Sequence, residues 1–182
     1  MKRFLINGPN KGVKGEINVS GAKNSCLPLM AASILFKKKV ILRNAPFVKD
    51  VLTMKDLLIS LGSKVELKKE KKIIKITNNK KHKLTVPYNL VSTMRAGVLT
   101  MGPLLARYPE SKIRVALGGG CALGIRDTSW HLSGFKSLGA DNTLNRGYVN
   151  IYSKNGLKGN IFKFPKVTVT GSSNLIMASV LI

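Results

Sequence analysis

Apolar positions along this chain switch between a period of two residues and a period of three to four. The shorter period predicts strands at 16–19, 40–42, 64–68 and 72–77, the last two forming a hairpin across the charged turn at 69–71. The longer period predicts two helices, with apolar positions at Leu27, Met30, Ala31, Ile34 and Leu35 and at Val51, Met54, Leu58 and Leu61. Their order along the chain is β-α-β-α-β-β.

The same order of elements then returns. Strands are predicted at 84–86 and 112–117 and a hairpin at 141–145 and 148–152, with helices marked by Val91, Met94, Val98, Met101 and Leu105 and by Leu132, Phe135 and Leu138. Gly62 and Gly139 follow the second helix of each unit, where a glycine commonly ends a helix. A third copy opens at Val167-Thr168-Val169. The pattern predicts repeats at about 21–82, 83–156 and 157–182, packed as helices and sheets into an α/β (α+β) domain.

A glycine-rich loop after the strand at 112–117 concentrates the candidate chemistry. It reads Gly118-Gly119-Gly120-Cys121-Ala122-Leu123-Gly124-Ile125-Arg126, and Asp127-Thr128-Ser129 makes a helix start directly after it. Glycines let the backbone approach a ligand closely, and a thiol near a cation and a helix start favours the thiolate. The simpler alternative is a small buried cysteine beside an arginine that binds nothing.

Composition limits the classes of function. The hydrophobic fraction is 44%, as in a globular chain, and no apolar run reaches the roughly 18 to 20 residues that span a bilayer. The apolar run near the start is too short for a signal peptide, so a cytoplasmic location is expected. Cys26 and Cys121 are therefore expected to be free thiols. His82 and His131 show no metal-ligand spacing, so no metal site is predicted.

The net charge of +23, from 31 Lys and Arg against 8 Asp and Glu, would attract nucleic acid, membrane surfaces or anionic metabolites. Nucleic-acid binding is not favoured, because basic and aromatic residues are not interleaved and no recognisable module occurs. The lysine clusters at 37–39, 68–72 and 80–83 fit exposed turns and strand faces. Biased codon composition in the source genome would explain them equally well.

Four motifs carry a resemblance to a known family. They are Ser20-Gly21-Ala22-Lys23-Asn24, Met94-Arg95-Ala96, Gly119-Gly120-Cys121-Ala122-Leu123-Gly124-Ile125-Arg126 and Lys166-Val167-Thr168-Val169-Thr170-Gly171. In this order they resemble UDP-N-acetylglucosamine 1-carboxyvinyltransferases, over the whole chain. Shikimate-pathway enolpyruvyl transferases share the fold but lack the cysteine loop. The resemblance implies an inside-out α/β barrel of two domains, each with three β-α-β-α-β-β units, and an active site between them.

The resemblance also implies an activity. The family transfers the enolpyruvyl group of phosphoenolpyruvate to the 3-hydroxyl of UDP-N-acetylglucosamine, the first committed step of peptidoglycan synthesis, and no cofactor is expected. Cys121 would donate a proton to phosphoenolpyruvate and form a covalent adduct with it. Lys23, Asn24 and Arg126 would bind phosphoenolpyruvate. The residues implied to bind UDP-N-acetylglucosamine are Arg95, Arg126, Asp127, Thr128, Ser129, Trp130, Lys166, Val167, Thr168 and Val169.

Simpler roles stay open for some of these residues. From the residues alone, Asn24 could be a helix N-cap and Lys23 a solvated charge, and Arg95 could extend its head group to water. The family usually reads Pro-Val-Asp-Leu where this chain has Asp127-Thr128-Ser129-Trp130, and it commonly has a proline at the position of Gly118. The loss of that acid and the bulk of Trp130 would change nucleotide affinity.

Length is the largest departure from the family, whose members are more than twice as long and draw a general-base aspartate and further arginines from a second domain. Residues 1–20 would belong to that second domain and 21–182 to an incomplete first domain. The apolar helical pattern reaches Ile182 without a stop signal. An N-terminal fragment is therefore expected, with a complementary C-terminal half as a possible partner. The alternatives are an inactive truncated remnant and a non-enzymatic basic protein that binds anions or nucleic acid.

Overall fold

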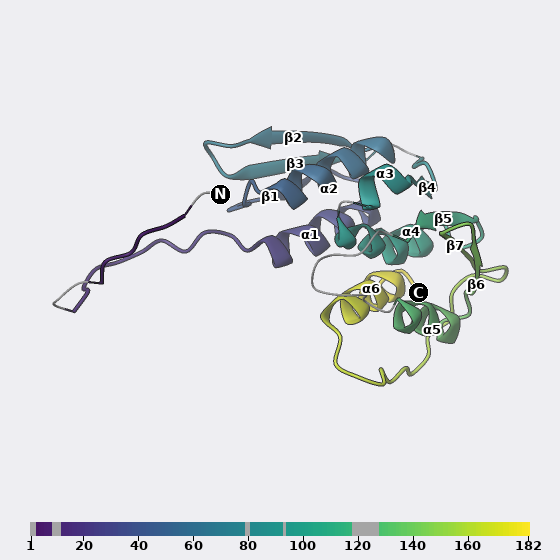
Figure 1. Ribbon diagram of the computed structural model, residues 1–182. Coiled ribbons are helices and arrows are strands. Elements are labelled where there is room, and N and C mark those ends of the chain that lie inside the picture. Colours follow the sequence, from purple (N-terminus) through teal and green to yellow (C-terminus); the bar gives the residue numbers. More distant parts are fainter. Residues whose placement is uncertain (1–2, 9–11, 79–80, 93, 118–127) are drawn as a thin grey trace.

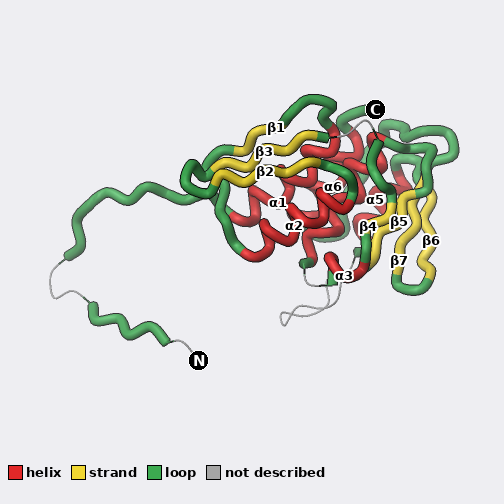
Figure 2. The backbone as a smooth tube through the Cα atoms, turned by 90° about the horizontal axis from the view of Figure 1, so that it is seen from above, coloured by secondary structure: helices red, strands yellow, loops and turns green. Residues whose placement is uncertain are grey.

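The computed structural model describes residues 3–8, 12–78, 81–92, 94–117 and 128–182, which form two sheets and the helices between them (Figure 1). Seen from above, the helices lie between the three-stranded first sheet and the four-stranded second sheet (Figure 2). The predicted α/β class is confirmed. Large apolar side chains from both sheets and from the helices share one core, and the fully buried ones include Met30, Met54, Leu58, Ile74, Ile76, Met101, Leu104 and Phe135.

The first repeat supplies the first sheet. Its elements are α1 (Lys23–Ala32), the short 3₁₀ helix η1 (Ser33–Leu35), β1 (Val40–Leu42), α2 (Lys49–Ser60), β2 (Lys64–Lys68) and β3 (Ile73–Thr77). The strand order is β1-β3-β2, and both pairings are antiparallel. Gly62, at φ +104°, ends α2 as predicted, because a residue with a Cβ rarely adopts that conformation.

The second repeat supplies the second sheet. Its elements are β4 (Thr85–Val86), α3 (Tyr88–Val91), η2 (Arg95–Thr100), α4 (Met101–Arg107), β5 (Ile113–Ala116), α5 (Ser129–Ser137), β6 (Asp141–Asn145) and β7 (Tyr148–Tyr152). The strand order is β4-β5-β7-β6, with β4 parallel to β5 and the other pairs antiparallel. The single helix predicted across 91–105 is wrong in detail, since it is divided into α3, η2 and α4. Gly97 and Gly102 lie in this segment, and glycine weakens a continuous helix.

Two strand predictions fail for a shared reason. Residues 12–22 contain no strand, and Ile17 and Val19 are 91% and 87% exposed. The third copy begins with a helix, α6 (Val169–Ser179), instead of a strand. An extended segment needs a neighbouring strand for its backbone hydrogen bonds, and neither segment has one among the described residues. The segment before α1 instead extends away from the helices (Figure 1). Its assignment to a second domain stays a prediction.

Candidate functional site

The start of α1 carries the first two predicted ligands, Lys23 and Asn24, and both are exposed. Lys23 Nζ forms an ion pair with Asp50 Oδ2 at 2.8 Å, and Asp50 lies in the first turn of α2. Lys23 is therefore not merely a solvated charge, because Asp50 holds its ammonium group near the beginning of two helices. This partner could not be predicted from the sequence, since the two residues lie on separate helices.

The backbone at the start of α1 is open to an anion. Ala22 occupies the N-cap position and has no side chain that could accept a hydrogen bond from the first turn. The first backbone N–H groups of a helix have no partner within the helix, and they attract anions together with the helix dipole. Asn24 lies inside the helix, so the alternative that it is the N-cap is wrong.

Asn44 fixes the turn that leads into α1, and sequence reasoning missed it. It has φ +53°, its Oδ1 accepts a hydrogen bond from Gly21 N at 3.2 Å, and its Nδ2 donates to Val19 O at 3.4 Å. A Cβ on Gly21 would lie 1.7 Å from Asn44 O, so only glycine fits at that position of the motif. An asparagine after a short strand is a signal for this conformation, because asparagine tolerates positive φ.

The glycine loop, 118–126, lies outside the described residues. Cys121, Arg126 and Asp127 fall there, so their predicted roles stay predictions. The helix start predicted after them is confirmed: Thr128 is the N-cap of α5 and Ser129 its first residue. Trp130 is half-buried in the first turn.

The last predicted segment, 166–169, forms the entry to α6. Thr168 caps this helix, its Oγ1 accepting a hydrogen bond from Gly171 N at 3.1 Å. Lys166, Val167 and Val169 are exposed, Val167 completely. Arg95 is the first residue of η2, and its side chain lies outside the described part of the chain.

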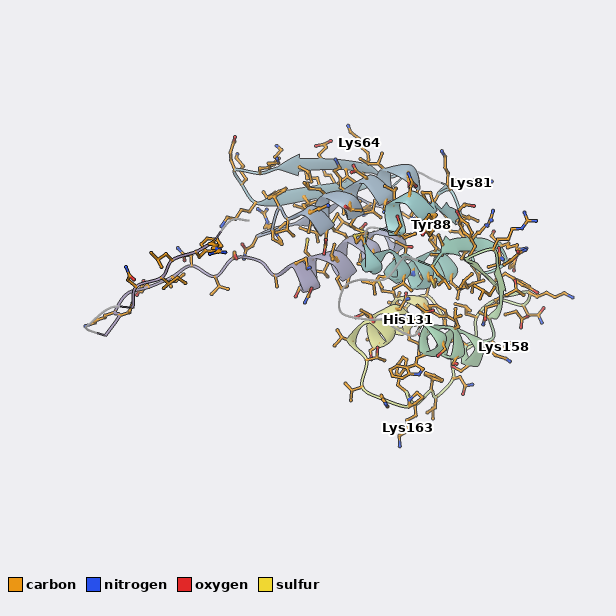
Figure 3. All side chains as sticks on the ribbon, in the orientation of Figure 1. Lys64, Lys81, Tyr88, His131, Lys158 and Lys163 are labelled. Carbon is orange, nitrogen blue, oxygen red and sulfur yellow. The ribbon has the colours of Figure 1, made fainter. Side chains whose placement is uncertain are left out.

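The helices bring several of these segments to one side. In Figure 1, α1, α5 and α6 all begin on the side from which the N-terminal segment extends. A buried contact fixes α6 against α5, since Asn174 Nδ2 lies 3.0 Å from His131 Nδ1. Figure 3 shows His131 where these two helices meet. The segments that carry the predicted ligands at the starts of α1, α5 and α6 therefore begin on one side in this view, and their grouping into one site stays a prediction.

Comparison with known proteins shows which family the chain belongs to. Residues 8–182 match the family model of EPSP synthase (3-phosphoshikimate 1-carboxyvinyltransferase). The chain belongs to the EPSP synthase family. A UDP-N-acetylglucosamine 1-carboxyvinyltransferase from Pelagibacter ubique is 46% identical over 181 residues, which is 100% of this chain and 42% of that relative. The relative of the same name from Cellvibrio japonicus is 43% identical over 181 residues, again 100% of this chain and 42% of the relative. The chain thus spans less than half the length of these relatives.

Solved structures of the EPSP synthase family share the fold at low sequence identity. An EPSP synthase from Acinetobacter baumannii has a TM-score of 0.66 at 18% identity, covering 95% of this chain and 40% of that one. The enolpyruvyl transferase NikO from Streptomyces tendae has a TM-score of 0.65 at 16% identity, and the match covers 82% of this chain and 32% of NikO. The predicted enolpyruvyl transferase type of fold is confirmed.

Two further findings concern the described residues only. They contain no group of three His, Cys, Asp or Glu side chains placed to hold a metal ion. None of their helices is long and apolar enough to cross a membrane.

Proposed function

We propose that this chain forms the first-domain part of a UDP-N-acetylglucosamine 1-carboxyvinyltransferase. The observation that carries the proposal is the 46% identity, over the whole chain, with a relative of that name. Since the chain spans 42% of that relative, the rest of the active site would come from a complementary C-terminal half. The substrates would be phosphoenolpyruvate and UDP-N-acetylglucosamine, and the reaction would supply peptidoglycan synthesis in the cytoplasm.

The start of α1 would hold phosphoenolpyruvate. The ammonium group of Lys23, fixed by Asp50 at 2.8 Å, offers a positive charge beside the uncapped N–H groups of the helix. A phosphate or carboxylate group placed there would gain charge-assisted hydrogen bonds and the favourable end of the helix dipole. Asn24 would add an amide donor, and Arg126 a planar guanidinium that matches phosphate or carboxylate oxygens.

The sugar nucleotide would lie across the starts of the other helices. Arg95 at the start of η2, Thr128 to Trp130 at the start of α5 and Lys166 to Val169 at the entry to α6 would contact it. Asp127 and Arg126 would complete this set. The exposed Val167 would offer an apolar contact to the nucleotide, because its side chain is free of other protein contacts in the solvent-exposed entry to α6.

Cys121 would supply the proton that the reaction needs. The 3-hydroxyl oxygen of the sugar bonds to the second carbon of phosphoenolpyruvate and gives up its proton to a base from the second domain. The methylene carbon takes a proton from the thiol, and loss of phosphate then restores the double bond and releases a proton. Addition of the thiol across the double bond, with sulfur on the second carbon and a proton on the methylene carbon, would give the covalent adduct, so the thiol must be able to ionise.

A second candidate function rests on charge alone. Lys64, Lys81, Lys158 and Lys163 project from different parts of the surface (Figure 3), so a net charge of +23 would attract many anions without a specific site. In this alternative the chain is a basic anion-binding protein or an inactive remnant.

Titration calorimetry of the protein with UDP-N-acetylglucosamine and UDP-glucose separates the two functions. A specific site predicts tighter binding of UDP-N-acetylglucosamine. It also predicts that Arg126→Ala weakens binding by about 1.5 to 3 kcal/mol, whereas the exposed control Lys38→Ala costs well under about 1 kcal/mol. Equal losses in the two variants, with no preference between the sugars, would assign the binding to the overall positive field.

A further inference from the structure

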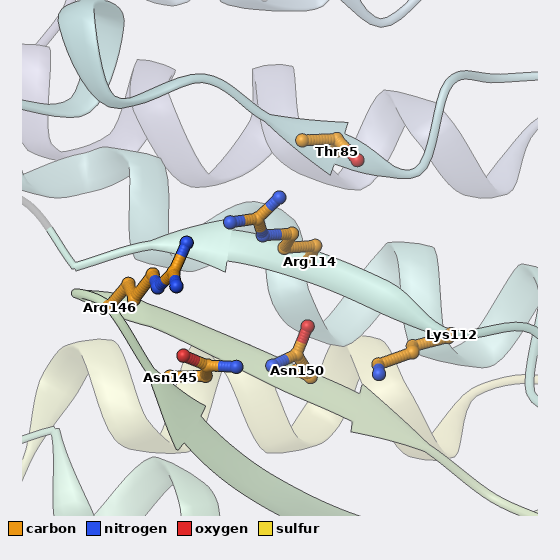
Figure 4. A pocket seen from close by; sticks show the side chains of 6 residues that line it. All are labelled: Thr85, Lys112, Arg114, Asn145, Arg146 and Asn150. Atoms are coloured by element: carbon orange, nitrogen blue, oxygen red, sulfur yellow. The ribbon is translucent and has the colours of Figure 1, made fainter.

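The outer face of the second sheet carries a basic pocket that none of the proposed substrate contacts uses. Its volume is about 500 Å³, within the range of small-molecule sites. The residues that line it are Thr85, Lys112, Arg114, Asn145, Arg146 and Asn150 (Figure 4). They come from all four strands of the sheet and the segments next to them, so one rigid element positions the whole set.

Strand register explains why these side chains meet. Thr85 pairs with Arg114 across β4 and β5, and Arg114 pairs with Asn150 across β5 and β7, which puts the three in one row on the outer face. Their neighbours Val115 and Val149 point inward and are buried in the core. Because side chains alternate between the faces of a strand, the core on one side fixes the polar row on the other.

Asn150 stands beside Arg114 in this row and has a polar side chain that faces the pocket. It is only 6% exposed, and its side chain makes no hydrogen bond within the described part of the chain. Figure 4 shows Asn150 between Asn145 and Lys112, next to the strand that carries Arg114. None of the buried side-chain nitrogen or oxygen atoms in the described residues lacks a hydrogen-bond partner, so the amide atoms of Asn150 are open to the pocket and can bond a ligand there.

Arg114 is held in place, and the charges around Asn150 have no acidic partner among the described residues. The Arg114 guanidinium lies over the ring of Tyr148, with its central carbon 4.0 Å from the ring centroid, which holds it against the sheet. Among the described residues, none of the salt bridges involves Lys112, Arg114 or Arg146. Asp141, at the start of β6, does not line the pocket.

The first sheet shows the opposite arrangement on its outer face. There Lys75 on β3 pairs with Glu66 on β2, and Glu66 also forms an ion pair with Lys64 at 3.2 Å. An acidic residue therefore stands among the lysines of the first sheet, whereas Asn150 stands opposite Arg114 in the second. The basic pocket is therefore specific to the second sheet and differs from the lysine-rich outer face of the first sheet.

We propose that this pocket binds the phosphate group of a small phosphorylated molecule. The lining offers two guanidinium groups, an ammonium group, two amides and a hydroxyl, all of which can donate, and it contains no carboxylate. Phosphate oxygens accept hydrogen bonds and match the fork of arginine. A compact set of three cations fits one phosphate-bearing group, whereas nucleic acid requires positive charges along an extended track.

Titration calorimetry with inorganic pyrophosphate, in about 150 mM NaCl to screen the overall field, tests the site. The wild-type protein is expected to bind with saturation. Arg114→Gln and Arg146→Gln should each weaken binding about tenfold, the cost of one charge-assisted contact. Asn150→Asp places a carboxylate opposite Arg114 and should abolish binding without lowering the melting temperature. This variant still tests the site if Arg114→Gln fails to fold.

Two controls separate this pocket from other anion sites. Lys64→Gln on the first sheet should leave pyrophosphate binding unchanged, and Lys23→Gln at the start of α1 should leave the Arg114-dependent part of the binding unchanged. Absence of saturable binding, or an equal loss in Lys64→Gln, would overturn the proposal. A loss in Lys23→Gln without one in Arg114→Gln would assign pyrophosphate to the substrate site instead. Tighter binding of a short oligothymidine through Arg114 and Arg146 would make the ligand a nucleic acid.

Discussion

The side chain of Asn174 on α6 is bonded to the backbone of Gly102 on α4. Its Oδ1 accepts a hydrogen bond from Gly102 N at 2.7 Å, and its Nδ2 donates to Val98 O at 2.9 Å. Asn174 is completely buried, so these bonds fix the position of α6 against the second repeat. The position of the start of α6, where predicted ligands lie, therefore depends on this contact.

Gly102→Ala should destabilise the protein, because a Cβ at this position would lie 2.2 Å from Asn174 O. One of the two helices would have to shift, at about 1 to 3 kcal/mol for an overpacked site. Unfolding in urea, followed by circular dichroism, measures the loss. Gly159→Ala is the matched control, since a Cβ there meets nothing within 4 Å. Equal stability of the two variants would show that the helices do not pack as closely as described.

Acid should weaken the fold through His82. This residue is buried, with its Nδ1 2.9 Å from Tyr108 Oη and its Nε2 3.2 Å from Asn78 Oδ1. Burial, together with the charge of Arg107, lowers the pKa of His82 to about 4. In the unfolded chain the imidazole of His82 takes up a proton below about pH 6.5, whereas in the folded protein it does so only near pH 4. The contribution of neutral His82 to the free energy of unfolding is therefore complete above about pH 6.5 and is lost as the pH falls toward 4.

The expected loss from His82 between pH 7 and pH 5 is about 2 kcal/mol of unfolding free energy. Urea unfolding of wild type and His82→Gln at both pH values measures it. The variant should be less stable at pH 7 and should lose less on acidification. The same decrease in both proteins would mean that other groups cause the acid sensitivity.

The two cysteines should differ in reactivity. Cys26 on α1 is only 6% exposed, and burial raises the pKa of its thiol, so little thiolate is present at neutral pH. Cys121 follows three glycines and precedes Arg126, which favours ionisation. Limited labelling with iodoacetamide, analysed by mass spectrometry, should modify Cys121 first. Labelling of Cys26 first, or of both at one rate, would contradict an activated thiol at Cys121.

Local signals in the sequence predicted much of this fold. Gly62 and Gly139 end helices at φ +104° and +88°, as expected for glycines at such positions. Both hairpins also lie where the alternating pattern put them, with Arg146 and Gly147 at one turn. These features depend on residues that are close in sequence, and for that reason they were accessible without the structure.

Features that depend on distant residues were not predictable. Residues 16–19 have a strand-like pattern, but a strand also needs a partner, and the pattern does not say which one. The ion pair between Lys23 and Asp50 joins two helices, and the turn held by Asn44 joins residues more than twenty positions apart. For the candidate site, the motifs therefore predicted the ligands, whereas the residues that position Lys23 and the entry to α1 came from the fold.

The most direct test of the proposed function is phosphate release from phosphoenolpyruvate. The chain would be joined after Ile182 to the C-terminal portion of the Pelagibacter ubique relative, and the relative's own two portions, joined in the same way, serve as the positive control. Residues 1–182 alone should release no phosphate, because the base and further arginines are expected from the other half. The joined protein should release phosphate only when UDP-N-acetylglucosamine is present. A joined protein that melts cooperatively and binds UDP-N-acetylglucosamine but releases no phosphate would contradict enolpyruvyl transfer by this chain.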